Sequence, residues 1–294
     1  MKKIGALEAG GTKMVLAVYD EQGNELERLT VPTLTPEETM PGMIDFFRRH
    51  EVDALGVGSF GPLDLDENSP TYGNITSTPK LAWKDYPLLK NLLDGRDIPA
   101  GIDTDVNAAI IAEAELGAAQ GCENAVYVTV GTGIGGGVYV NGKTAHGLLH
   151  PEVGHMLLRP RADDPIPHGV CPYHDGCLEG LAAGPAIGAR IGGDAKNLPD
   201  DHPVFELEAH YLAQMCVNLI VTVSPQKIVL GGGVMQRENI LPMVRKETAR
   251  LLNGYVQSPM ITENIDEYIV APRLFPVSGL VGSYLIGKRA LEKT

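Results

Sequence analysis

Aromatic residues, cysteines and long hydrophobic runs are scarce in this chain. Aromatics make up 5% of its 294 residues, and there are four cysteines. Four cysteines are too few for the disulfide framework of a small secreted domain, so we expect reduced thiols. The longest apolar stretch, residues 212–223, is interrupted by Gln214 and Asn218 and is too short to cross a bilayer. These features argue against a disulfide-rich secreted domain and against a membrane-spanning protein.

Positive charge is also in short supply. The formal net charge is -13 at pH 7, which argues against general affinity for nucleic acids or anionic membranes. A glycine-rich turn can still bind a phosphorylated ligand within an acidic protein. A strand-like pattern begins almost at the amino terminus, so we expect no signal peptide and a cytoplasmic location. The length and the 44% hydrophobic content predict two globular domains of ordinary size.

Metal-binding residue types gather in residues 150–180. Cys171 and Cys177 flank His174 with two residues on either side, and His155 lies upstream. Two thiolates and two imidazoles suit tetrahedral zinc, and four protein ligands make a closed, structural site. The alternative is a loop with unpaired cysteines and scattered histidines. We favour a structural zinc site formed by these four residues.

A glycine-rich turn lies near the amino terminus. Apolar segments flank residues 8–13, of sequence Glu-Ala-Gly-Gly-Thr-Lys, and predict a β-hairpin. Walker and dinucleotide-binding loops need a helix after the glycines, and neither spacing is present. Gly10 and Gly11 let backbone amides approach an anion, and Thr12 and Lys13 add a hydroxyl and a charge. A plain hairpin turn is the alternative to a phosphate site.

A second turn of the same kind follows. Residues 125–130 predict a strand, residues 131–137 contain five glycines, and residues 138–140 predict the next strand. A turn without side chains exposes its N–H groups to a phosphate. Two such hairpins, each followed by a helical half, suggest a duplicated architecture, although the sequence similarity between the halves is weak.

The rest of the chain alternates helices with strands that end in glycine or polar residues. This pattern indicates an open α/β fold with ligands at the strand ends. The predicted helices are residues 35–50, 87–93, 108–120, 184–192, 203–223, 239–253 and 278–291, and the further strands are residues 25–31, 53–60, 100–103, 226–230 and 269–271.

Asp105 and Asn107 follow the strand at residues 100–103 and adjoin a helix. A carboxylate at a strand end is well placed to point into a cleft. Asp and Asn also commonly cap helices at such positions. On position alone, we favour the capping role.

Taken in order, these motifs resemble the ROK family of sugar kinases, within the hexokinase–actin–Hsp70 superfamily of ATPases. The resemblance covers nearly the whole chain. It is carried by the two glycine turns, residues 103–107, the Glu-Val-Gly-His sequence at residues 152–155, the cysteine–histidine loop, Glu179 and the three glycines at residues 231–233.

Within that family the chain resembles the bacterial fructokinases most. Glu8 stands where most sugar kinases of the family carry Asp, and Thr104 stands where glucokinase-like members usually carry Asn. Residues 78–83, Thr-Pro-Lys-Leu-Ala-Trp, are similar to a fructokinase segment. The Cys-x2-His-x2-Cys spacing replaces a more cysteine-rich version, which changes a ligand type and keeps the ligand number.

The resemblance implies a two-domain hexokinase/actin-like fold, built from duplicated ribonuclease-H-like domains with a cleft between them. The small domain would contain residues 1–108 and 277–294, and the large domain, residues 109–276, would carry the zinc loop. The implied reaction transfers the γ-phosphoryl group of Mg²⁺-bound ATP to a hexose, most simply to C6 of fructose. A homodimer is also implied, with no nucleic-acid or membrane partner.

The resemblance also assigns roles to residues. It makes Asp105 the general base, which reverses the preference for a cap. The implied phosphate contacts are Gly10, Gly11, Thr12, Lys13, Thr132 and Gly133, and the adenosine side falls to Gly231, Gly232 and Gly233. The implied sugar contacts are Gly61, Asn107, Glu152, His155 and Glu179, and the implied zinc ligands are His155, Cys171, His174 and Cys177.

Three other functions compete with this hypothesis. A kinase for glucose, mannose or an N-acetylated amino sugar would differ only in the sugar pocket. A sugar-responsive repressor needs a helix-turn-helix, normally ahead of the first glycine turn, and a turn that starts at Glu8 leaves no room for one. A non-catalytic, zinc-stabilised sugar-binding module is disfavoured by the two phosphate-type turns.

Overall fold

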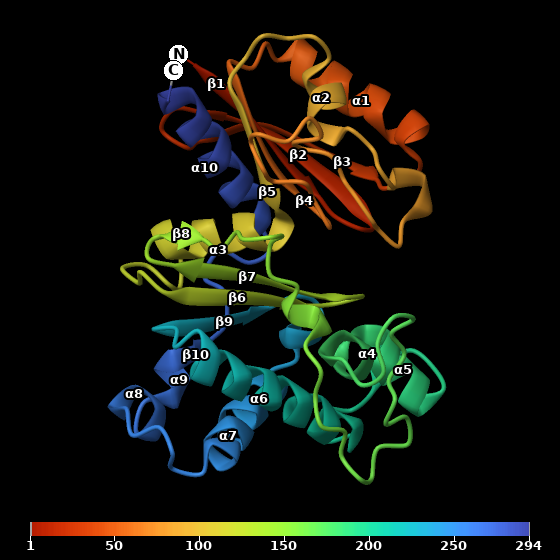
Figure 1. The fold of residues 1–294 in the computed structure, drawn as a ribbon, viewed down its shortest axis with the longest axis vertical. Helices are drawn as coiled ribbons and strands as arrows, with labels where there is room; N and C mark the ends of the chain where they lie inside the picture. Colours follow the sequence, from red (N-terminus) through yellow and green to blue (C-terminus); the bar gives the residue numbers. More distant parts are fainter. Residues whose placement is uncertain (1, 294) are drawn as a thin grey trace. The chain divides into compact units, whose positions relative to one another are not determined.

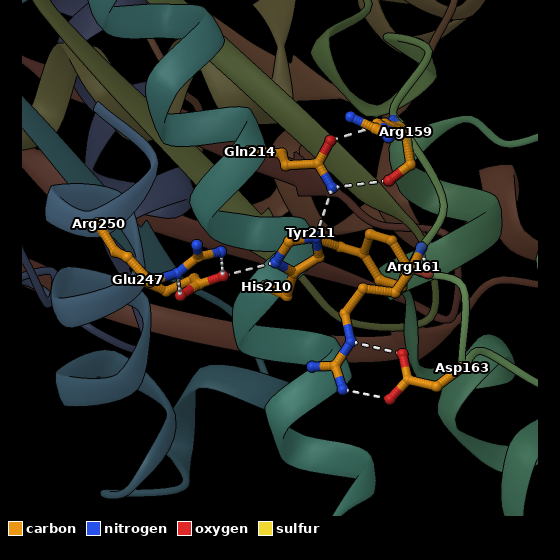
Figure 2. A network of polar contacts seen from close by, with 8 residues as sticks. All are labelled: Arg159, Arg161, Asp163, His210, Tyr211, Gln214, Glu247 and Arg250. Atoms are coloured by element: carbon orange, nitrogen blue, oxygen red, sulfur yellow. Dashed lines mark hydrogen bonds and ion pairs between the residues drawn. The ribbon is translucent and has the colours of Figure 1, made fainter. Parts of the chain in front are cut away.

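The structure is a computed structural model that describes residues 2–293, and within them the chain divides into two compact units. The first unit contains the residues up to Ala112, Thr144–His150 and the residues from Val277 on. The second contains Glu113–Lys143 and Pro151–Pro276. Each unit is built around its own sheet (Figure 1).

The sheet of the first unit has five strands, in the order β3-β2-β1-β4-β5, among the described residues. β1 pairs antiparallel with β2 and parallel with β4, β2 pairs antiparallel with β3, and β4 pairs parallel with β5. The strands are β1 (Lys3–Ala9), β2 (Lys13–Asp20), β3 (Glu25–Pro32), β4 (Ala54–Ser59) and β5 (Ala100–Thr104).

The sheet of the second unit repeats this topology. Its order within the described chain is β10-β9-β6-β7-β8, with β6 antiparallel to β7 and parallel to β9, and with β9 parallel to β10. The strands are β6 (Ala125–Val130), β7 (Ile134–Val140), β8 (Lys143–Thr144), β9 (Lys227–Gly231) and β10 (Ile269–Val270). The predicted α/β fold and the predicted duplication are therefore confirmed.

Helices cover the first sheet and bury its hydrophobic residues. α1 (Pro36–Arg49) begins with a capping box of Thr35 and Glu38. The C-terminal α10 (Ser278–Glu292) packs on β4, β1 and β5, and Figure 1 shows it along this sheet. The packing is so close that a Cβ on Gly56 of β4 would lie 1.8 Å from the Ser283 carbonyl oxygen. The core of the first unit includes Leu7, Met14, Leu16, Met43, Phe47, Leu55, Val57, Trp83 and Leu88 of α2 (Leu88–Leu93).

Outside its sheet, the second unit contains helices and long irregular segments. α6 packs against α7, and the shorter helices α4 and α5 follow the cysteine–histidine loop. The helices are α4 (Leu178–Ala182), α5 (Gly184–Ile191), α6 (Val204–Thr222), α7 (Ile240–Leu252), α8 (Pro259–Thr262) and α9 (Ile265–Tyr268). The sequence did not predict α4, α8 or α9, because helices of four or five residues are too short to show a helical period.

Two predicted boundaries were wrong for identifiable reasons. α3 (Asp105–Glu115) begins at Asp105 and ends before residue 120. It ends early because Glu113 accepts the Ala118 N–H, and a side chain on Gly117 would collide with Glu113. The second glycine turn is also shorter than expected, since β7 already begins at Ile134 and contains the next three glycines.

No helix among the described residues is both long and apolar enough to cross a membrane.

Candidate active site and metal centre

The first glycine turn connects β1 to β2 in the first unit. Gly10 donates its N–H to the Lys13 carbonyl at 3.0 Å, and the Thr33 hydroxyl donates to the Gly10 carbonyl at 2.7 Å. Within residues 2–293, no hydrogen bond engages the N–H groups of Gly11 and Thr12. Exposed, unpartnered amides beside an exposed lysine form the kind of backbone site that binds phosphate. The turn is therefore equipped for an anion.

Two carboxyl groups with raised pKa values lie near this turn. Burial raises the pKa of Asp105 to about 6, although its Oδ1 accepts the Val106 N–H at 2.9 Å. Burial, followed by the charge of Asp105, raises the pKa of Glu8 to about 7. Carboxyl groups perturbed in this way are concentrated at catalytic sites. The first unit thus holds a candidate base at the strand end where the resemblance places one.

The predicted capping role at this corner belongs to Thr104. Its hydroxyl accepts the Asn107 N–H at 3.1 Å, which satisfies a free donor of the first turn of α3. Asp105 is therefore free of that structural duty. Asn107 is 1% exposed, and its Nδ2 donates to Asp103 Oδ1 at 2.7 Å. Gly61, at the end of β4, is half-buried, and a Cβ there would lie 3.3 Å from the ring of His150.

The second glycine turn connects β6 to β7 in the second unit. Gly131 donates its N–H to the Gly133 carbonyl at 2.9 Å. In the part of the chain that the structure describes, no hydrogen bond engages the N–H groups of Thr132 and Gly133. The carboxylate of Glu179 accepts the Ile134 N–H at 2.9 Å and lies against Gly133, where a Cβ would meet it at 2.7 Å. This turn presents the same two consecutive free amides as the first one.

The four predicted metal ligands come together in the second unit. One ligand atom each from His155, Cys171, His174 and Cys177 lies within 4.8 Å of the other three. Sγ of Cys171 is 3.6 Å from Nδ1 of His174, and Sγ of Cys177 is 3.8 Å from Nδ1 of His155. Zinc bonded tetrahedrally to sulfur and nitrogen at its usual distances separates them by about 3.6 Å. The cluster has the composition and size of a metal centre.

The metal cluster is joined to the second glycine turn through α4. Cys177 is the N-cap of α4, and its Sγ accepts the Gly180 N–H at 3.4 Å. Glu179, in the first turn of the same helix, holds the Ile134 N–H. Burial raises the pKa of the Cys177 thiol to about 11, so a bound cation would be needed to keep it as a thiolate. An ion there would fix the helix that braces the turn.

His155 and Glu152 lie on a short segment that packs on β7. Glu152 is the N-cap of η2 (Val153–His155) and is exposed. A Cβ on Gly154 would lie 1.9 Å from the Ile134 carbonyl, so only glycine allows this approach. Because Nδ1 of His155 faces the sulfur atoms, its Nε2 lies on the opposite ring edge. The structure therefore brings Glu179, and Gly154 next to His155, to the first residue of β7.

The three glycines at the end of β9, residues 231–233, have different surroundings. A Cβ on Gly231 would meet the Tyr127 hydroxyl at 2.7 Å, and one on Gly232, whose φ is +93°, would lie 2.4 Å from the Val130 carbonyl. Gly233 has only Gln236 nearby, at 4.0 Å. Packing within the sheet thus explains the first two glycines, and open space surrounds the third.

The sequence pattern missed two features of the first unit. Cε of Lys80 would lie 3.2 Å from a Cβ on Gly11, so a lysine lies beside the first turn. Asp103 is hydrogen-bonded to His146, which is 43 residues away in the chain. The similarity of residues 78–83 to a fructokinase segment could have drawn attention to Lys80. No local signal pairs Asp103 with His146.

The fold and the two glycine turns define the class of sugar kinases and their relatives with a duplicated, actin-like α/β architecture. The ROK family profile matches residues 4–289. The chain belongs to the ROK family.

Individual relatives give the same result. The fructokinase of Pediococcus pentosaceus is 45% identical over 289 residues, which cover 98% of this chain and 99% of that protein. The fructokinase of Zymomonas mobilis is 42% identical over 304 residues, with 99% of each covered. Among solved structures, the ROK hexokinase of Thermus thermophilus has a TM-score of 0.78 at 29% identity and covers 99% of this chain and 100% of that one.

Proposed function

We propose that this chain is an ATP-dependent fructokinase, which transfers the γ-phosphoryl group of ATP to the C6 hydroxyl of fructose. The observation that carries the proposal is the likeness, over nearly the whole chain and at 42 to 45% identity, to bacterial proteins named fructokinase. Phosphoryl transfer depends on positioning and charge stabilisation more than on covalent chemistry. The free amides of the two turns would supply the positioning, and Asp105, whose pKa is raised by burial, would supply a base.

Asp105 is proposed as the general base. A carboxyl group with a pKa of about 6 is ionised at neutral pH and is a stronger base than an ordinary aspartate. Because its Oδ1 accepts the Val106 N–H, the other oxygen is the one proposed to take the proton of the attacking hydroxyl. No further covalent step is required of the protein.

The other predicted residues are proposed to position the two substrates. The free amides of the two turns would bind ATP phosphates, and magnesium would reach those phosphates with most of its water retained. The proposed phosphate contacts are Gly10, Gly11, Thr12, Lys13, Thr132 and Gly133, with the space at Gly231, Gly232 and Gly233 left to adenosine. The proposed sugar contacts are Gly61, Asn107, Glu152, His155 and Glu179.

Zinc is the proposed ion of the cysteine–histidine cluster. Two sulfur and two nitrogen ligands favour zinc over magnesium or calcium, and a set of four protein ligands leaves no open position for catalysis. Its proposed role is to fix α4 and η2, and with them Glu179 and His155. A homodimer and action in the cytoplasm, where ATP is made, complete the proposal; the dimer can be tested by light scattering.

A coupled assay of ADP release, run over a panel of hexoses with Mg·ATP, tests the proposal. Fructose should give the highest kcat/KM, with mannose, glucose and N-acetylated amino sugars well below it. Fructose turnover far below that of glucose or mannose would replace fructose with that sugar. Absence of sugar-dependent ADP release with every hexose would reject the kinase assignment itself.

A further inference from the structure

A short segment of the first unit, residues 144–150, is fastened across the carboxyl ends of two neighbouring strands. At one end the His150 ring accepts the Leu63 N–H at 3.1 Å, just beyond the end of β4. At the other end His146 reaches Asp103, in the last residues of β5. β4 and β5 are adjacent and parallel, so both anchors lie at the same edge of the sheet. Ligands of open α/β folds bind at this edge.

Asp103 is the centre of the anchor at β5. It is 5% exposed, and its two oxygens accept hydrogen bonds from four donors. These are the Thr104 N–H at 2.8 Å, Asn107 Nδ2 at 2.7 Å, the Thr144 hydroxyl at 3.0 Å and His146 Nε2 at 3.1 Å. Three of these donors share Oδ1, and the Thr144 hydroxyl binds Oδ2, so the buried carboxylate ties together four groups of the first unit. Its task is to hold its donors in place.

His146 differs from Asp103 in its exposure. Its side chain is 41% exposed, and its Nε2 is held by Asp103 and lies 3.4 Å from Asn107 Nδ2. Nδ1 has no partner among the described residues. The two nitrogens of an imidazole lie on different edges of the ring, so Nδ1 is turned away from the carboxylate. The hydrogen bond to Asp103 also raises the pKa of His146 and fixes which nitrogen is held.

This arrangement places a fixed, exposed hydrogen-bonding group against the residues on either side of the proposed base in the chain. Asp105 lies between Asp103 and Asn107 in the chain, and both of those residues contact His146. An imidazole whose Nε2–H is given to a carboxylate accepts through Nδ1, so it suits a hydroxyl group. We infer that His146 hydrogen-bonds a hydroxyl of the bound hexose through Nδ1, and that Asp103 is the residue that positions it. The inference rests on the proposed hexose kinase function.

Two amide substitutions of His146 separate its proposed contact with the sugar from its hydrogen bond to Asp103. The amide group of glutamine lies where Nε2 of histidine lies, and that of asparagine lies where Nδ1 lies. His146→Gln therefore keeps the bond to Asp103 and removes the group that faces the sugar, whereas His146→Asn does the reverse. His50→Gln is the matched control, because His50 lies at the amino end of β1, where Lys3 Nζ donates to its carbonyl.

The decisive measurement combines steady-state kinetics with calorimetric titration of fructose into the full chain. In His146→Gln we expect KM and Kd for fructose to rise about 3- to 10-fold, the usual effect of one hydrogen bond, with KM for ATP and the thermal midpoint unchanged. His50→Gln should match the unchanged chain. A purely structural His146 gives the opposite pattern, with a normal His146→Gln and a destabilised His146→Asn, and that result would overturn the inference.

Asp103→Asn tests the positioning role. It keeps the volume but removes the negative charge that the Thr104, Asn107 and His146 donors share at Oδ1, so the hold on His146 is weakened. We expect the fructose KM to rise at least as much as in His146→Gln, with a fall in kcat because Asn107 and Thr104 adjoin Asp105. A fructose KM within twofold of that of the unchanged chain would contradict this role.

The two proposals fail in distinguishable ways. If the unchanged chain binds fructose without turning it over, the kinase assignment fails, and the calorimetric comparison still decides the role of His146. If the unchanged chain phosphorylates hexoses and His146→Gln keeps normal fructose affinity, only the inference fails. Absence of hexose binding by the unchanged chain would overturn both.

Discussion

In the first unit, β1 leads into a glycine turn beside Glu8, and the last strand, β5, runs directly into Asp105. In the second unit, β6 leads into the equivalent turn beside Glu179, and the equivalent last strand, β10, runs into Ala271 and Pro272. The strand order is the same, and the chemistry at the strand ends differs. A duplicated framework can thus keep two glycine turns with free amides while the proposed base lies in one copy and the cysteine–histidine cluster in the other.

The largest expected effect comes from removal of the proposed base in the first unit. Asp105→Asn should lower kcat about 10²- to 10⁴-fold, the usual contribution of a general base, with little change in the affinities for ATP and fructose. Rapid-quench kinetics and calorimetry measure the two quantities. Asp97→Asn, an exposed carboxylate of the same unit, is the control. Turnover near that of the unchanged chain would remove Asp105 from the mechanism.

The same residue sets the expected pH dependence of the reaction. A base must be ionised to accept a proton, and the pKa of Asp105 is raised by burial to about 6. kcat should therefore be nearly constant above pH 7 and fall about tenfold per unit below pH 6. A pH–rate profile from pH 4.5 to 8.5, at saturating fructose and ATP, checks this. A descending limb centred near pH 4 would show that the reacting carboxyl is unperturbed.

A substitution in the metal cluster of the second unit should lower stability, whereas Asp105→Asn in the first unit should lower catalysis. Cys177→Ser removes a ligand of the cluster and weakens the cap of α4, so zinc content should fall well below one ion per chain. The thermal midpoint should drop by roughly 5 to 10 °C, since the loss of a structural metal costs several kcal/mol. Elemental analysis and scanning calorimetry measure both effects. The control is Cys122→Ser, because Cys122 lies outside the cluster.

Much of the difference between the two units could be predicted from local sequence. The hairpins, the spacing of the cysteines and histidines and most helices are set by neighbouring residues, whose periodicity and turn chemistry can be read directly. The start of β7 could not be predicted in this way. Three glycines in a row resemble a turn, yet Gly136 lies in a strand. It is a glycine because a Cβ there would lie 2.6 Å from Val153. That requirement comes from a segment packed on the sheet.

The hydrogen bond between Asp103 and His146 could not be predicted from local sequence either, because the two residues are 43 positions apart. Asp103 ends a strand, and His146 lies in an irregular segment that has no period of its own. Their meeting depends on tertiary structure. The role of Asp105 shows a related limit, since its position fitted both a cap and a base. The structure gives the capping bond to Thr104, and the role of Asp105 as a base stays a prediction.

Buried acids provide a further comparison between the units. Glu208 of α6 is 0% exposed, its two oxygens have no hydrogen-bond partner in the described chain, and burial raises its pKa well above the usual value. Glu8 has a pKa raised by burial to about 7. Each folded-state pKa exceeds the unfolded one, so the folded state holds a proton that the unfolded chain releases above about pH 4.5. Both acids therefore lower stability as the pH rises from that point.

Replacement of either acid by its amide should remove this cost. Glu8→Gln should raise the free energy of unfolding at pH 8 by about 2 to 3 kcal/mol, and the gain should vanish near pH 4. Glu208→Gln should change stability in the same direction. Only Glu8→Gln should also change turnover, because Glu8 lies near Asp105, whereas Glu208 is buried in the second unit near Arg190. Urea unfolding at both pH values provides the measurement, and an equal gain at pH 4 and pH 8 would contradict the linkage.

The smallest expected effect tests whether the first turn relies on more than its amides. Lys80 lies against Gly11, whereas in the second turn the carboxylate of Glu179 lies against Gly133. A positive charge there would stabilise the phosphate oxygens, and its removal in Lys80→Met should lower kcat/KM for ATP roughly 10-fold, because a partly exposed charge is weakened by solvent. The neighbouring exposed Lys84→Met is the control. If both variants keep normal ATP kinetics, the two turns bind phosphate through their backbones alone, and the charge difference between the units has no role in the reaction.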